Sequence, residues 1–199
     1  MVKRLSVGVI GIQGAISEQV LSMQNVLRET QTPGDVKVIK NPQEIKKIDA
    51  LILPGGESTT ISRVLYQSGL FNEIKKRIDK GNLPIMGICA GCIILGSEMV
   101  DKTNDVKLLS AMDMEVKRNA FGRQRESFEQ NIEVEGFSDS YHAVFIRAPI
   151  IEKVGNKCKI LAKIDKKIVM ARQDNLLALS FHPELTDDLR IHKYFLELI

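Results

Sequence analysis

The sequence predicts an α/β fold: a three-layer sandwich in which helices cover both faces of a mixed, mostly parallel central sheet. In the first half of the chain, short apolar runs alternate with amphipathic segments at helical spacing, a pattern typical of parallel strands joined by helices. From about residue 106 to 172, strand-like runs follow one another without such helices. The second pattern indicates antiparallel additions to the parallel core.

The elements of the first half follow from local patterns. The apolar run from Leu5 to Ile10 predicts a first strand, and the turn from Gly11 to Gly14 leads into a helix. That helix is indicated by apolar residues at helical spacing, namely Ile16, Val20, Met23 and Leu27. Apolar runs then predict strands over residues 36–39, 50–53 and 83–88, with helices over 61–66, over 71–80 and after Cys89.

The second half is predicted to add strands over residues 127–134, 143–147, 158–164 and 167–171. Residues 176–181 form another apolar run that we expect to rejoin the parallel core, and residues 187–198 are expected to close the fold as a helix. No internal repeat or linker interrupts the 199 residues, a length that suits one hydrophobic core. We therefore expect a single domain over residues 1–199.

Composition and charge exclude several classes of protein. Hydrophobic residues make up 44% and charged residues 27%, both ordinary for a globular protein. The net charge of +3 is small, and basic residues alternate with acidic ones, as over 73–80, so we expect no nucleic acid partner. Uncharged stretches fall short of the roughly 18 residues that a membrane span needs, so we expect no membrane partner. Three cysteines do not make a disulfide framework, which indicates a reducing, cytoplasmic environment.

The most informative local motif is Cys89 between Gly87 and Gly91, directly after an apolar strand. Flanking glycines allow a sharp strand-to-helix turn that projects the residue between them. The following helix N-terminus favours the thiolate, which is the nucleophilic form. A buried, inert cysteine is the plainer interpretation of a lone cysteine. A second alternative is a redox pair, because Cys89 and Cys92 form a C-x-x-C sequence.

Near the end of the chain, His182-Pro183-Glu184 follows the apolar run that ends at Phe181. Pro183 favours an extended His182, and residues two apart in an extended segment share a face. Glu184 can then hold one ring nitrogen, provided that its carboxylate curls back, and so stabilise an imidazolium. Taken alone, the motif is equally typical of a turn histidine beside a surface glutamate. With Cys89 it predicts a nucleophile, a base and an orienting acid.

The loop from Pro54 to Thr59 contains adjacent glycines, Gly55 and Gly56, whose backbone N–H groups can approach a ligand closely. Ser58 or Thr59 is expected to cap the following helix. The loop lacks the ending of a Walker A sequence, so beside a nucleophilic cysteine it favours an oxyanion site. Ligands of open α/β sheets bind at the carboxyl ends of the strands. The loop, Cys89 and His182 all lie at such ends.

Over nearly its whole length the chain resembles the class I, triad-type glutamine amidotransferases. Within that class it is most similar to the glutaminase subunits of pyridoxal 5'-phosphate synthase (the PdxT or SNO family). The cysteine turn and the His-Pro-Glu segment are similar to the wider class. More specific strings are Pro54-Gly55-Gly56-Glu57-Ser58-Thr59 and Arg118-Asn119-Ala120-Phe121-Gly122-Arg123-Gln124. Three residues depart from the family pattern, namely Ile88 in place of Thr, Cys92 in place of an aliphatic residue, and Gln19 where His often follows Glu18.

The resemblance implies hydrolysis of L-glutamine through a Cys89 thioester, with His182 and Glu184 completing the triad. It implies an oxyanion site at Gly56 and Ala90, and glutamine contacts from Gly55, Gly56, Glu57, Arg118, Ile146 and Arg147. It also implies a synthase partner (PdxS), in a large hetero-oligomer, that receives the ammonia and activates the glutaminase by docking. We expect no cofactor and no metal. Two rivals remain at this stage: a dithiol oxidoreductase using Cys89 and Cys92, and a catalytically silent regulatory module with the same fold.

Overall fold

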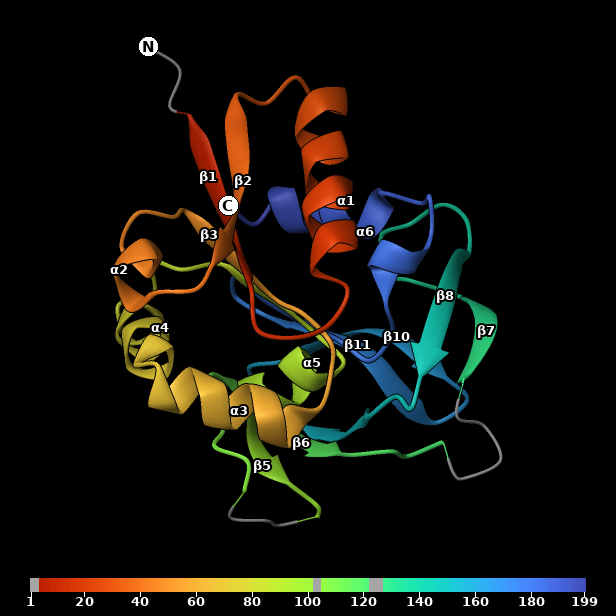
Figure 1. The fold of residues 1–199 in the computed structure, drawn as a ribbon. Coiled ribbons are helices and arrows are strands. Elements are labelled where there is room, and N and C mark those ends of the chain that lie inside the picture. Colours follow the sequence, from red (N-terminus) through yellow and green to blue (C-terminus); the bar gives the residue numbers. More distant parts are fainter. Residues whose placement is uncertain (1–3, 102–104, 122–126) are drawn as a thin grey trace.

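A computed structural model describes residues 4–101, 105–121 and 127–199, and its main feature is a ten-stranded sheet. Five neighbouring strands of this sheet run parallel (Figure 1). Their order across the sheet is β2 (Gly34–Ile39), β1 (Leu5–Ile10), β3 (Ala50–Leu53), β4 (Ile85–Ile88) and β12 (Leu176–Leu179). The first four are joined by helices, as the alternating pattern predicted.

The fifth parallel strand comes from the far end of the chain. β12 pairs with β4 so that Leu179 lies opposite Ile88, the last residue of each strand. The backbone N–H of Cys89 also donates to the carbonyl of Leu179 over 2.8 Å. Because the two strands end at the same level, the segments that follow them emerge side by side. This register brings Cys89 and His182 to one edge of the sheet.

The antiparallel additions lie beyond β12. The sheet continues through β11 (Lys167–Gln173), β9 (Ile150–Val154), β6 (Met112–Lys117) and β5 (Gly96–Met99), and β10 (Lys159–Ile164) pairs with β11. The pairs between β12, β11, β9 and β6 are antiparallel, whereas β5 and β6 are parallel to each other. β7 (Ser127–Ile132) and β8 (Tyr141–Ile146) form a separate antiparallel hairpin. β5, β6 and β9 had no counterpart among the predicted strands.

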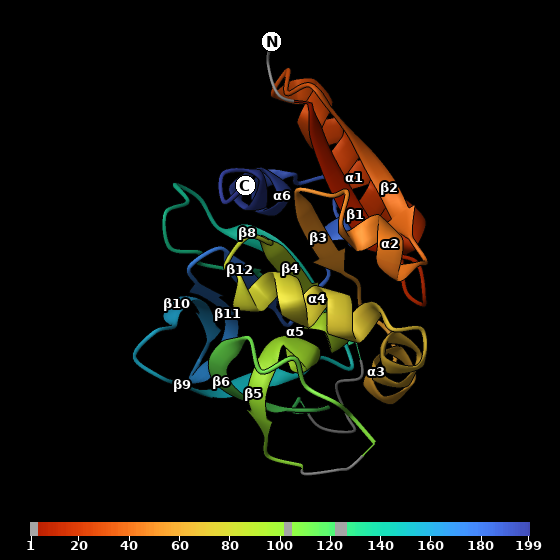
Figure 2. The same cartoon turned by 90° about the vertical axis from the view of Figure 1, so that its left-hand side faces the viewer.

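Helices cover both faces of the sheet, as Figures 1 and 2 show together. Alternation along β3 illustrates the two cores, because Ala50 and Ile52 pack into one and Leu51 and Leu53 into the other. The first core is closed by α1 (Ile16–Glu29), α6 (Arg190–Leu196) and the β7–β8 hairpin. The second is closed by α2 (Pro42–Ile45), α3 (Ser58–Gln67), α4 (Leu70–Asp79) and α5 (Ala90–Leu95).

Three local differences from the sequence expectations have physical reasons. α2 was not predicted because its single turn, started by the capping box of Asn41 and Glu44, is too short to show a helical period. The closing helix is shorter than residues 187–198, since a 3-10 turn, η1 (Pro183–Leu185), and a loop precede α6. In α1 the polar Gln19 is fully buried while Ile16 is only half-buried, so an apolar pattern misplaced the buried face.

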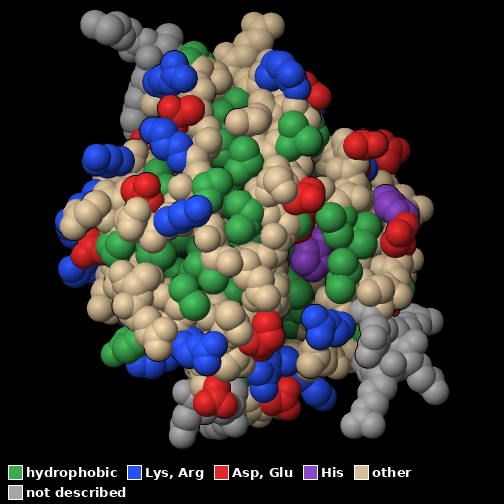
Figure 3. All heavy atoms as spheres, in the orientation of Figure 1, with side chains coloured by type: hydrophobic (Ala, Val, Ile, Leu, Met, Phe, Trp, Pro, Cys, Tyr) green, Lys and Arg blue, Asp and Glu red, His purple; other side chains and the backbone are tan. Residues whose placement is uncertain are grey.

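The surface carries both signs of charge. On the face drawn in Figure 3, basic and acidic side chains are interspersed, as the small net charge of +3 and the alternating charges predicted. None of the described helices combines the length and the apolar character that crossing a membrane requires.

Candidate active site

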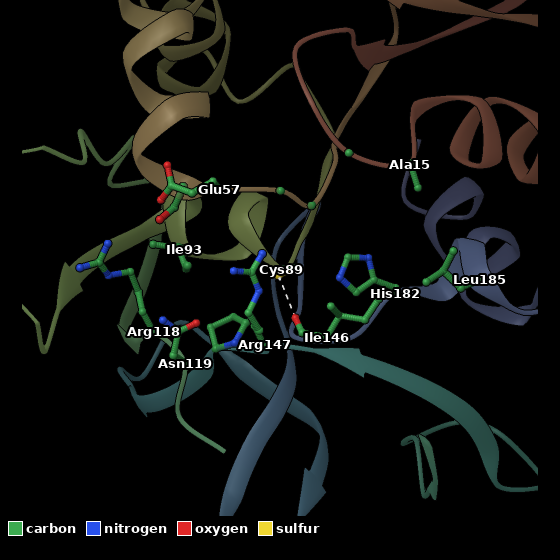
Figure 4. A pocket seen from close by; sticks show the side chains of 15 residues that line it. Ala15, Glu57, Cys89, Ile93, Arg118, Asn119, Ile146, Arg147, His182 and Leu185 are labelled. Carbon is green, nitrogen blue, oxygen red and sulfur yellow. Dashed lines mark hydrogen bonds between the residues drawn. The ribbon is translucent and has the colours of Figure 1, made fainter. Parts of the chain in front are cut away.

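A cavity of about 380 Å³ opens at the carboxyl edge of the parallel strands (Figure 4). Most of the residues predicted to bind or react line it: Gly55, Gly56, Glu57, Cys89, Arg118, Ile146, Arg147 and His182. Two predicted residues do not line it. Glu184 lies behind His182, and Ala90 is buried at the start of α5. The structure therefore gathers side chains from five separate segments of the sequence.

Cys89 occupies the sharp turn between β4 and α5. Its φ of +50° lies in the left-handed region, which is unfavourable for a residue with a side chain and is held here by the surrounding packing. The flanking glycines are required because a Cβ at Gly91 would overlap the carbonyl oxygen of Leu53, and one at Gly87 would lie 2.7 Å from the carbonyl oxygen of Gly91. The turn leaves Cys89 7% exposed at the cavity wall.

His182 is anchored from both sides. Its backbone N–H donates to the carbonyl of Val144 over 2.8 Å, and its Nδ1 lies 2.8 Å from Glu184 Oε1. The 3-10 turn η1 curls the chain so that the fully buried carboxylate reaches the ring. Burial alone lowers the pKa of His182, but its hydrogen bonds to Cys89 and Glu184 and their charges outweigh burial and raise the pKa to about 10. The imidazolium is therefore the favoured form at neutral pH.

Gly55 lies between the Cys89 side chain and the His182 ring. Because it has no side chain, the two can approach each other closely. A Cβ at Gly55 would lie 2.5 Å from His182 Cε1 and 3.4 Å from Cys89 Cβ. Only a glycine leaves room for both side chains here. The Cys89 Sγ also lies 3.9 Å from the carbonyl oxygen of Ile146, the contact drawn as a dashed line in Figure 4.

The Gly55–Gly56 loop is fixed by the β1–α1 turn, a contact that sequence reasoning missed. Gln13 Oε1 accepts from the backbone N–H of Glu57 over 3.0 Å. Gly14 packs so closely on the carbonyl oxygen of Gly55 that a Cβ there would overlap it. Gly56 has a φ of +141°, which other residues rarely adopt. The sequence predicted only a turn over residues 11–14. Apart from the polar Gln13 between two glycines, it gave no indication that this turn holds the loop.

Glu57 caps α3, so the expectation that Ser58 or Thr59 forms the N-cap is wrong. Glu57 Oε1 accepts from the N–H of Thr59 and Oε2 from that of Thr60, at 3.0 and 2.7 Å. The longer side chain reaches back over the first turn because its own backbone is extended. Partial burial raises its pKa, but these two backbone bonds outweigh burial and hold the pKa below its ordinary value. A carboxylate thus faces the cavity.

Part of the cavity wall is basic and polar. Arg118 follows β6 and Arg147 follows β8, and both line the cavity with Asn119. Asn119 and Arg147 have φ values of +46° and +42°. Arg118 Nε is buried and has no hydrogen-bond partner in the described part of the chain. The strands before these residues bring both arginines to the cavity wall. Sequence reasoning singled out both arginines only through the resemblance and missed Asn119.

Cys92 does not line the cavity. It is fully buried in the core under α3 and α4, whereas Cys89 belongs to the core on the opposite face of the sheet. Burial, followed by the proximity of Cys89, raises the pKa of Cys92 far above its ordinary value. All three cysteines are free. A buried, protonated thiol on the other face of the sheet does not suit a redox partner of Cys89.

The arrangement is that of a nucleophilic cysteine with a charged histidine, an orienting carboxylate and ionic groups of both signs around one cavity. Among the described residues, no group of three His, Cys, Asp or Glu side chains is placed to hold a metal ion.

The chain is similar to known proteins over nearly its whole length. The model of the SNO glutamine amidotransferase family matches residues 9–199. A protein of Archaeoglobus fulgidus named pyridoxal 5'-phosphate synthase subunit PdxT is 48% identical over 197 residues, covering 98% of each chain. One of the same name from Pyrococcus horikoshii is 44% identical over 196 residues, covering 98% of this chain and all of the relative.

Solved structures agree with these relatives. A crystal structure described as a glutamine amidotransferase superposes with a TM-score of 0.85 at 42% identity, covering 96% of this chain and 97% of the other. A glutamine amidotransferase of Thermotoga maritima has a TM-score of 0.63 at 15% identity, covering 98% and 82% of the two chains, and supports the fold alone.

Proposed function

Because the chain belongs to the SNO glutamine amidotransferase family, we propose that it hydrolyses the side-chain amide of L-glutamine to glutamate and ammonia, as the glutaminase subunit of a pyridoxal 5'-phosphate synthase. The observation that carries the proposal is the arrangement of Cys89 beside His182, with His182 Nδ1 2.8 Å from Glu184 Oε1. That arrangement supplies a nucleophile, a proton donor and an anion that holds the ring.

The first half of the reaction forms a thioester. The Cys89 thiolate attacks the amide carbon of glutamine, and the carbonyl oxygen becomes an oxyanion. His182, charged in the resting enzyme, gives its Nε2 proton to the amide nitrogen. The carbon–nitrogen bond breaks and ammonia leaves. Glu184 stabilises the ring charge before this transfer and keeps Nδ1 protonated afterwards, so that Nε2 is free to act as a base.

The second half releases glutamate. Neutral His182 takes a proton from water as the water oxygen attacks the thioester carbon. The carbon–sulfur bond then breaks, and the thiolate and imidazolium are restored. The cavity wall at Gly55 keeps the ring and the sulfur on the same side of the substrate, so one histidine can serve both halves.

Backbone N–H groups are proposed to hold the oxyanion, with Gly56 in the loop and Ala90 at the start of α5 as donors. Ala90 follows the nucleophile directly, at a helix N-terminus where N–H groups lack helical partners. Gly56 lies across the cavity, in the loop that Gln13 ties down. By analogy with other hydrolases, each such donor is worth roughly 3 to 4 kcal/mol in the transition state.

The ionic groups of the cavity suit the two charges of an amino acid. Arg118 and Arg147 carry donors that pair with a carboxylate, and Glu57 carries an anion that can accept from an ammonium group. Gly55, Gly56 and the backbone of Ile146 complete the proposed glutamine contacts around the amide end.

A synthase partner follows from the chemistry and from the relatives. Ammonia released into water is protonated and lost by diffusion, so a glutaminase that supplies nitrogen works beside the enzyme that consumes it. The relatives are named as subunits of pyridoxal 5'-phosphate synthase. We propose that this chain assembles with the synthase subunit, PdxS, in a large hetero-oligomer, and that docking activates it.

The test is ammonia release from L-glutamine by the purified chain, with and without the synthase subunit. We expect turnover in the complex and its loss in Cys89→Ala. A glutamine-analogue chloroketone should alkylate Cys89, which a catalytically silent module would not allow. If the complex of wild-type chains releases no ammonia from glutamine, the proposed function is wrong.

A further inference from the structure

Behind the catalytic histidine lies a layer of buried polar side chains that the mechanism does not use. Among the described residues, the buried side chains of Asp, Glu, Lys, Arg and His are only His182, Glu184 and His192. Gln19, on α1, is fully buried beside His192, and its Oε1 lies 3.0 Å from His192 Nε2. Burial lowers the pKa of His192 to about 4, so that ring is neutral at the pH of catalysis.

Several buried polar side-chain atoms have no hydrogen-bond partner within the described chain. They are Gln19 Nε2, Ser180 Oγ, Glu184 Oε2 and His192 Nδ1, and the one further such atom, Arg118 Nε, belongs to a residue at the far end of the cavity (Figure 4). Burying an unpaired carboxylate oxygen costs about 1–3 kcal/mol or more, so Glu184 Oε2 is expected to have a donor.

Gln19 is well placed to supply that donor. Its helix α1 packs against both η1, which carries Glu184, and α6, which carries His192. Ala15, one helical turn before Gln19, lines the cavity with His182 and Leu185. Residues four apart share a helix face, so Gln19 lies on the face that looks toward η1. Ser180, the residue after β12, is the other candidate donor, but the alternation that continues from β12 to Phe181 places it on the side of Leu176 and Ala178, away from α1.

The hydrogen-bonding groups of Gln19, His192 and Glu184 also complement one another. Since Gln19 Oε1 accepts from His192 Nε2, the remaining atom of the carboxamide is a donor, and a carboxylate oxygen only accepts. Reversing the amide would turn an oxygen toward Glu184 instead. We propose that Gln19 is a positioning residue for the reaction: its Nε2 donates a hydrogen bond to Glu184 Oε2 through one bridging water, and His192 holds the carboxamide in that orientation.

This inference rests on the proposed glutaminase, and its consequence is specific. With one oxygen on His182 and the other on Gln19, the Glu184 carboxylate stays ionised and fixed in direction. Without the second bond the Glu184 carboxylate is held less firmly, so it stabilises the His182 imidazolium less well. The effect should fall on kcat rather than on KM, because Gln19 does not line the cavity that receives glutamine.

The sharpest test is the isosteric change Gln19→Glu. It keeps the acceptor for His192 but replaces the donor toward Glu184 by an oxygen, so two like charges repel each other while both carboxylates are ionised. In the complex with the synthase subunit, we expect kcat at pH 8 to fall at least about tenfold with KM within about twofold. Activity relative to wild type should rise several-fold toward pH 6, as a protonated Glu at position 19 donates again.

Two variants serve as controls. Ser22→Ala alters a buried polar side chain one turn along the same face of α1 and should leave kcat and the pH profile unchanged. Ser180→Ala removes the competing donor and should also be silent. A loss of kcat in Ser180→Ala, with Gln19→Glu at wild-type activity, would overturn the assignment in favour of Ser180.

A second readout does not depend on glutamine hydrolysis. In the isolated chain, NMR titration of the His182 ring should give a lower midpoint in Gln19→Met, which removes the donor without adding a charge, than in wild type, with the folded spectrum retained. If wild type proves inactive in the complex, the glutaminase proposal fails and this titration still judges Gln19. An unchanged His182 midpoint together with unchanged kcat would show that Gln19 has only a packing role.

Discussion

His182 Nδ1 and Glu184 Oε1 lie 2.8 Å apart although a single residue separates them in the chain. Pro183 begins a 3-10 turn directly after an extended His182, and the turn swings the carboxylate back under the ring. The pair is buried, with 11% of the His182 side chain and none of the Glu184 side chain exposed. Water therefore screens the interaction little, and it can raise the pKa of His182 to about 10 together with Cys89.

Glu184→Gln tests this pair. The amide keeps the shape but removes the charge, so the pKa of His182 should fall and kcat should drop by roughly 10²–10⁴-fold, by analogy with other triads. In the wild type the folded pKa lies above the unfolded value of about 6.5, so the stabilisation from His182 is complete below pH 6.5 and is lost as pH rises through about 10. NMR titration and urea unfolding from pH 6 to 10 measure both effects. An unchanged midpoint in the variant would contradict the pairing.

The two neighbouring cysteines should behave differently. Cys89→Ala should lower glutamate production by at least about 10³-fold, because the nucleophile is lost. Cys92→Ala should retain turnover and lose about 1 kcal/mol of stability through a small cavity in the core. Glutaminase assays of both complexes, with thermal unfolding of both chains, separate the roles. A dithiol oxidoreductase would need both thiols, so loss of function in Cys92→Ala would favour that rival.

Gly55→Ala should block the reaction while leaving the fold intact. The new methyl would stand 2.5 Å from His182 Cε1 and 3.4 Å from Cys89 Cβ, so the ring must move away from the sulfur. A displacement of this size is expected to reduce kcat by about 10²-fold. Gly81→Asn is the matched control, because that position is open and its positive φ suits asparagine. Equal activities of the two variants would argue against close packing of ring and thiol.

Glu57→Ala should weaken both the helix and the substrate site. Loss of the cap on α3 should cost about 1 kcal/mol, which lowers Tm by about 2–4 °C in a chain of this size. Loss of the anion at the cavity should raise KM for glutamine with a smaller change in kcat. Ser58→Ala, at the next residue, should not show the loss of Tm, since Glu57 and not Ser58 forms the cap. Steady-state kinetics and thermal unfolding distinguish the two variants.

Acid should destabilise the chain partly through His192. Its folded pKa, lowered to about 4 by burial, lies below the unfolded value of about 6.5, so the unfolded state binds the proton first. Stability is therefore lost as pH falls from 6.5 to 4, by roughly 3 kcal/mol from this residue. In His192→Gln the free energy of unfolding should fall less over that range. An identical acid dependence in both chains would mean that His192 is not buried as the neutral form.

Much of the fold could be predicted because its signals are local. The strands at 5–10 and 50–53 were predicted with the bounds that the structure has, since each is a short apolar run between turn residues. β5, β6 and β9 were missed because each is a short strand that mixes buried with exposed residues, and such segments resemble ordinary surface segments. The buried face of α1 was predicted wrongly because Gln19 is buried against His192 on another helix. No local sequence pattern reveals such a contact.

By itself, the sequence determined that a cysteine sits in a glycine-flanked turn, that a histidine and a glutamate follow an apolar run, and that both sites end strands of an α/β sheet. These features depend on neighbouring residues and backbone geometry. Only the tertiary structure decided that β12 inserts beside β4, that Gln13 holds the Gly55–Gly56 loop, and that Gln19 pairs with His192. Those contacts join residues from 44 to 173 positions apart, so they exist only once the chain has packed.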